Sequence, residues 1–111
     1  MERSIMQRDT NRLILQFEQL LRQVNREVIN PEIEDLSLEK LRPIIQMVAK
    51  SRAAYLKRLY DISIIHNETN GLPTQEEMAE LKLLRERFID LTDGAKSIEI
   101  SIQRGYLDLQ S

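Results

Sequence analysis

Cysteine and tryptophan are absent from this chain of 111 residues, and glycine and proline occur three times each. The absence of cysteine excludes disulfides, thiolate zinc ligands and cysteine nucleophiles, and it fits a reducing compartment. Aromatic residues make up only 5% of the sequence, whereas sheets are rich in aromatic and β-branched residues. Because Leu, Ile, Glu, Arg and Gln suit helices, we expect an all-α protein.

Long hydrophobic runs are also missing. The sequence contains no stretch of about 18 apolar residues that could cross a bilayer. Its N-terminal residues are charged throughout, which argues against a secretory signal. The net charge is −2, so the chain lacks the basic excess of a general nucleic-acid-binding protein. We expect a cytoplasmic protein with no membrane segment.

Residues that carry chemistry are sparse. His66 is the single histidine, so it cannot supply the clustered ligands that zinc or iron needs, and we expect it to pack or cap at the end of a helix. Gly71, Gly94 and Gly105 are isolated and form no phosphate-binding loop. No hydroxyl has a nearby base to activate it. We therefore expect no enzyme activity, no cofactor and no metal site.

What the sequence does have is helical periodicity in three segments, where apolar residues recur at steps of three and four. The predicted helices cover residues 4–29, 38–67 and 74–108. The first stripe is Met6, Thr10, Leu13, Phe17, Leu20, Val24 and Val28, with Leu21 at one edge. The second is Leu41, Ile45, Val48, Tyr55, Leu59, Ile62 and His66. The third is Met78, Leu81, Leu84, Phe88, Leu91, Ala95, Ile98, Ile102 and Tyr106.

Local signals mark the helix ends. Asn30-Pro31 should end the first helix, since proline disfavours helical geometry in the residue before it. Pro43 predicts either a kink in the second helix or a start near residue 41. Thr74 and Glu77 have the spacing of a capping box. Gly94 could bend the third helix.

Together these features predict a single domain over residues 1–111, an antiparallel three-helix bundle of long, coiled-coil-like helices in which the third is longest. A third helix of that length would project beyond the bundle and leave its last apolar turns uncovered. We expect Ile98, Ile102, Tyr106 and Leu109 to form an interaction surface there. A homodimer or an unidentified partner protein would cover it.

Arg52 is the basic residue that falls on the second apolar stripe. Its side chain could reach water from the edge of the stripe. Alternatively it could form a buried ion pair with a carboxylate such as Glu18 or Glu86, which would set the register of the helices or of a dimer. Both interpretations stay open at this point.

Basic residues elsewhere in 40–61 are spread around the helix and do not line one groove, so nucleic-acid binding by this segment is not expected. The sequence predicts a non-enzymatic protein–protein interaction module: an adaptor, an assembly factor or a chaperone-like bundle. The alternative is a nucleic-acid-associated accessory factor that uses the basic faces of the first two helices. In the first helix that face would consist of Arg8, Arg12, Arg22 and Arg26.

Overall fold

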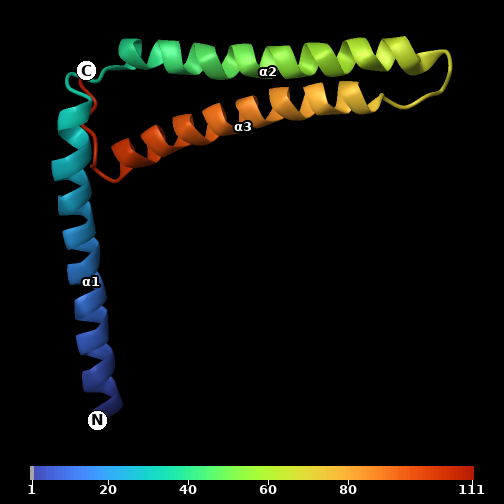
Figure 1. The fold of residues 1–111 in the computed structure, drawn as a ribbon. Helices are drawn as coiled ribbons and strands as arrows, with labels where there is room; N and C mark the ends of the chain where they lie inside the picture. The colour runs from blue at the N-terminus through green and yellow to red at the C-terminus, as the bar shows by residue number, and fades with distance from the viewer. Residues whose placement is uncertain (1) are drawn as a thin grey trace. The chain divides into compact units, whose positions relative to one another are not determined.

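The structure, a computed structural model, describes residues 2–111, with side chains from residue 6 onward, and it is all-α (Figure 1). Its elements are the helices α1 (Glu2–Ile29), α2 (Leu38–Asn67) and α3 (Gln75–Gln103) and the short 3-10 helix η1 (Asn30–Glu32). Within the described residues there is no strand, and one isolated bridge joins Ser37 to Gln110. The predicted fold class is confirmed.

Several of the predicted helix boundaries hold. α1 ends at Ile29, and Pro31 lies in η1. α2 begins at Leu38 and continues through Pro43. The capping box before α3 is formed: the Thr74 hydroxyl accepts from the Glu77 amide at 3.1 Å, and a Glu77 carboxylate oxygen accepts from the Thr74 amide at 2.8 Å. α3 remains helical through Gly94.

The chain divides into two compact units. The clasp unit consists of Met1–Leu38 and Glu99–Ser111, and the hairpin unit consists of Glu39–Ile98. Each unit has its own buried residues, and each is described by itself below. The single domain expected over residues 1–111 stays a prediction.

In the hairpin unit, α2 and α3 run antiparallel and pack against each other (Figure 1). Their less exposed residues recur at alternating steps of three and four, the spacing at which two helices share a narrow seam. On α2 these residues are Leu41, Ile44, Val48, Ser51, Tyr55, Arg58 and Ile62. On α3 they are Glu77, Leu81, Leu84, Phe88, Leu91, Ala95 and Ile98. Ile62 is the best buried of the described side chains, at 1% exposure.

The seam on α2 differs from the predicted stripe. Ile45 and Leu59 were expected inside but are exposed, whereas Ser51 is buried and Arg58 is half-buried. The Arg58 guanidinium reaches water-accessible Glu80, with 3.0 Å between Nε and Oε2. The reason is that one partner helix covers a seam about two residues in seven wide, which leaves the edge of a wider apolar face exposed.

α3 is shorter than predicted, and with 29 residues it is not the longest helix, since α2 has 30. Gly105 reverses the chain just after α3, with φ at +79°. Its amide bonds to the carbonyl of Ile102, and the amide of Tyr106 bonds to the carbonyl of Ser101 at 2.8 Å. This is a Schellman ending, in which a left-handed residue satisfies the last carbonyls of a helix.

Candidate functional site

The four residues predicted as an interaction surface do not share one exposed helical stripe. Ile98 and Ile102 lie on α3 and are half-buried. Tyr106 lies past the end of the helix and is buried, at 8% exposure, whereas Leu109 is exposed. The predicted projection of α3 to residue 108 is wrong, because the Schellman ending redirects the chain at Gly105. Self-association through these four residues stays a prediction, but the projecting helix on which it was based is not present.

The segment after α3 is bound within the clasp unit by a set of polar contacts. The Arg26 guanidinium donates to both carboxylate oxygens of Asp108, at 2.8 and 2.6 Å, and also to the carbonyl of Gly105 at 3.1 Å. The Asp108 amide donates to the side chain of Asn30 at 3.0 Å. The hydrogen bond from Arg26 holds the pKa of Asp108 below its usual value, despite the opposite effect of desolvation.

Apolar residues accompany these bonds. Leu36 and Leu107 are buried, at 4% and 3% exposure, together with Tyr106. The Gln110 amide donates to the carbonyl of Leu36 at 2.7 Å. One end of the clasp unit is therefore well packed, and it includes Tyr106, which was predicted to lie on an exposed interaction surface.

Most of α1 presents the opposite situation. Its apolar residues from Met6 to Val28 remain between 40% and 68% exposed, and no residue of the clasp unit covers them in the part of the chain that the structure describes. We call this surface the α1 face; it consists of Met6, Leu13, Ile14, Phe17, Leu20, Leu21, Val24 and Val28. At 1.5 Å per residue it is about 33 Å long. Within the clasp unit, the first predicted stripe is thus a surface and not a core.

The hairpin unit has a second apolar surface along one flank of its seam. An open groove of about 620 Å³ lies between α2 and the start of α3. We call it the hairpin groove; its lining is Tyr55, Leu59, Pro73, Met78, Ala79, Leu81, Lys82 and Arg85. Its charged lining residues are both basic. The floor is apolar, and Leu59 and Met78 are among the exposed large hydrophobic residues.

Arg52 lies on this same flank of α2 and does not form the buried ion pair that was one of its two predicted roles. It is exposed, and its guanidinium carbon is 5.0 Å from the centroid of the Phe88 ring. That geometry is a cation–π contact. The side chain therefore lies across the seam while its charge stays in water, as the other interpretation predicted. The apolar spacing along the second helix could not distinguish these two roles, since the outcome depends on which α3 residue faces Arg52.

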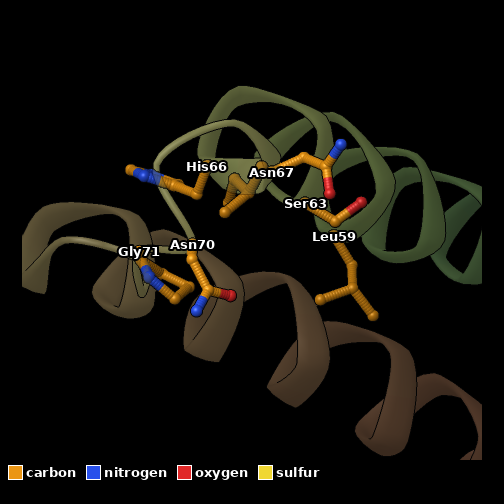
Figure 2. Close-up of a pocket in the computed structure, with 8 residues that line it drawn as sticks. Leu59, Ser63, His66, Asn67, Asn70 and Gly71 are labelled. Atoms are coloured by element: carbon orange, nitrogen blue, oxygen red, sulfur yellow. The ribbon is translucent and has the colours of Figure 1, made fainter.

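The pocket at the tip of the hairpin contains the single histidine (Figure 2). His66 Nε2 lies 2.7 Å from Glu77 Oε1, and both side chains are largely buried. The amide of Thr74 and the contact with His66 lower the pKa of Glu77. His66 thus joins the end of α2 to the capping box of α3. The predicted packing role fits this position, but its partner Glu77 was not foreseen.

The tip pocket offers little for catalysis. Ser63 lines it, but its hydroxyl donates to the carbonyl of Tyr60 at 2.7 Å. Glu77 already accepts from Thr74 and contacts His66. Among the described residues, no group of three His, Cys, Asp or Glu side chains could hold a metal ion.

None of the helices in the described part of the chain is long and apolar enough to span a bilayer.

Comparison with known proteins gives no further guide: no family model, no curated protein and no solved structure matches the chain significantly. The α1 face and the hairpin groove are therefore interpreted from their own chemistry. Both are extended apolar surfaces on helices. Neither surface has the enclosed shape and convergent polar groups of a small-molecule site.

Proposed function

We propose that this protein is a non-enzymatic protein–protein interaction module that acts as an adaptor, an assembly factor or a chaperone-like bundle in the cytoplasm. The observation that carries the proposal is the α1 face. A large apolar side chain has about 60–120 Å² of surface that burial would remove from water. The eight side chains of the α1 face are about half exposed, so together they leave roughly 300–500 Å² of apolar surface in contact with water. The largest apolar patch on a typical soluble monomer is of about this size, roughly 300–600 Å², and such a patch often has a function.

The width of the α1 face indicates what kind of surface it fits. Between residues 13 and 24, residues of this face occupy about three of every seven positions, as in Leu13-Ile14, Phe17 and Leu20-Leu21. Helices with such a face pack against two neighbouring helices, whereas two positions in seven suit a single partner helix. The expected contact is therefore a helix docked on a helical surface.

The alternative, a nucleic-acid-associated factor, has less support from the described side chains. Arg26 is held by Asp108 in the clasp unit. On α2, Arg42 lies 3.3 Å from Glu39 and Lys57 lies 2.7 Å from Asp61. Acidic neighbours offset several of the positive charges that phosphate binding would use. These pairs are exposed and individually weak, so a direct binding test is needed.

Affinity capture from the native cell with mass spectrometry tests the proposal. Phe17→Asp introduces a charge in the middle of the α1 face, and Leu15→Asp makes the same change on the opposite side of α1, where Leu15 is also exposed. We expect specific proteins to be captured by the wild type and by Leu15→Asp, and to be lost with Phe17→Asp. Capture that is equal for all three chains would contradict the proposal.

A mobility-shift series with DNA and RNA at rising salt addresses the alternative. Nucleic-acid binding weakens steeply with salt, whereas contact between apolar helices does not. Micromolar binding that is abolished by Lys50→Glu with Lys57→Glu would favour the alternative.

A further inference from the structure

The α1 face and the hairpin groove carry opposite charges along their borders. At 100° per residue, Asp9, Glu18 and Glu27 lie next to the α1 face, each roughly 80–100° from its centre. The four arginines of α1 whose side chains are described lie roughly 140–180° away, on the far side of the helix. These arginines are Arg8, Arg12, Arg22 and Arg26. Over residues 6–28, whose side chains the structure describes, the α1 face is therefore bordered by acids and by no base.

The hairpin groove has the complementary pattern. Lys82 and Arg85 belong to its lining, and no acidic residue does. Arg52 adds a third positive charge on the same flank, where it lies over Phe88. Lys82 has one acidic neighbour, Glu86, at 3.9 Å and one turn further along α3. An apolar helix with acidic borders is thus the occupant that this groove fits by charge and by polarity.

The groove also matches the width of the α1 face. It lies between two helices, and a face with three apolar positions in seven needs two helices to cover it. Leu59 from α2 and Met78 from α3 contribute apolar side chains to the groove. A helix docked there would contact α2 at Tyr55 and Leu59 and α3 between Met78 and Arg85.

We propose that α1 of a second copy of this chain docks in the hairpin groove, and that the exchange is reciprocal. This inference rests on the proposed interaction function and names the partner. Because the two complementary surfaces belong to the same chain, a twofold arrangement uses both surfaces of both copies and leaves neither in water. The two α1 faces would contribute roughly 600–1,000 Å² of apolar surface, and the grooves with their flanks would supply the rest of the roughly 1,200–2,000 Å² that a stable, specific interface buries.

Charge reversal provides the first test, with sedimentation velocity of the purified full-length chain at tens of micromolar. The wild type should be a dimer. We expect Asp9→Lys with Glu18→Lys, and separately Arg52→Glu with Arg85→Glu, to weaken the dimer at least tenfold. A chain that carries all four changes should dimerise again, because its charges are complementary with the signs exchanged.

A matched control reverses charges on the far side of α1. Arg8→Glu with Arg22→Glu changes the net charge of the chain by the same amount as the groove variant, and it should leave the dimer intact. Circular dichroism should show that every variant remains helical. A wild type that is monomeric at this concentration would overturn the proposal. A folded chain with all four substitutions that fails to dimerise would also overturn it.

Cross-linking then tests which surfaces meet, and the absence of cysteine makes it selective. Chains with Leu20→Cys alone and chains with Leu59→Cys alone are mixed and treated with a short bismaleimide. We expect the mixed species, with α1 of one copy linked to the groove of the other. Links between two Leu20→Cys chains alone would show that two α1 helices pair with each other, which overturns docking in the groove.

The failure of this inference and the failure of the proposed function are distinguishable. A monomeric wild type whose cellular partners are lost with Phe17→Asp would refute the second copy and leave the interaction function standing. A dimer that dissociates with Phe17→Asp and not with Leu15→Asp, and that gives the mixed cross-link, supports the reciprocal exchange.

Discussion

The chain reversal at Gly105 can be tested by one substitution made at two glycines. Gly105 has φ at +79°, whereas Gly94 lies within α3. A Cβ added at either position meets no atom within 4 Å, so only backbone conformation distinguishes the two sites. Left-handed geometry costs a residue with a Cβ about 1–2 kcal/mol. In contrast, alanine is favoured over glycine within a helix by about 1 kcal/mol.

Gly105→Ala should therefore lower the free energy of unfolding by about 1–2 kcal/mol, and Gly94→Ala should raise it by about 1 kcal/mol. Urea denaturation followed by circular dichroism measures both variants. Because the Gly105 carbonyl accepts from Arg26, hydrogen exchange should also increase around residues 105–110 in Gly105→Ala. If Gly105→Ala is as stable as the wild type, the assigned chain reversal is wrong. If Gly94→Ala is destabilising, the helical environment assigned to Gly94 is wrong.

Three further outcomes follow from buried and charged groups. Ile62→Ala should cost about 2–4 kcal/mol in urea denaturation because the side chain is fully enclosed, whereas exposed Ile65→Ala should change stability by less than about 0.5 kcal/mol. Arg52→Ala should cost no more than about 1 kcal/mol, the value of an exposed cation–π contact; a larger loss would mean that the guanidinium has a buried partner. The pKa of Asp108 is lower in the folded protein than its ordinary value of 3.8. The ionised carboxylate therefore stabilises the clasp unit at pH values above 3.8, and this stabilisation should be lost as the pH falls through the lower pKa of the folded state. Urea titrations in a pH series should show that dependence in the wild type and not in Asp108→Asn.

The role of α1 shows the limits of a periodic pattern. The stripe from Met6 to Val28 predicted an amphipathic helix, and α1 is that helix. The pattern also implied a covered face, but the side chains are exposed. Periodicity reports that an apolar face exists and how wide it is, and it does not report which element covers it or whether that element belongs to the same chain.

Local signals determined most of the secondary structure. The all-α class followed from composition and period, and the Thr74–Glu77 capping box formed as its spacing predicted. These features depend on contacts within about four residues, so the sequence contains them directly. The end of α3 was missed although Gly105 was visible, because the apolar spacing through Ile102 and Tyr106 continued past it.

Only the tertiary structure decided which residues meet across the chain. Arg26 and Asp108 are 82 positions apart, and no local pattern pairs them. The same holds for Arg52 with Phe88 and for the half-buried position of Arg58. Such contacts depend on the rotation of each helix about its axis, and a rotation by one residue, about 100°, replaces the residues in the seam. The sequence by itself determined which helices form and how wide their apolar faces are, whereas packing decided which residues enter the seam and which remain exposed for a partner.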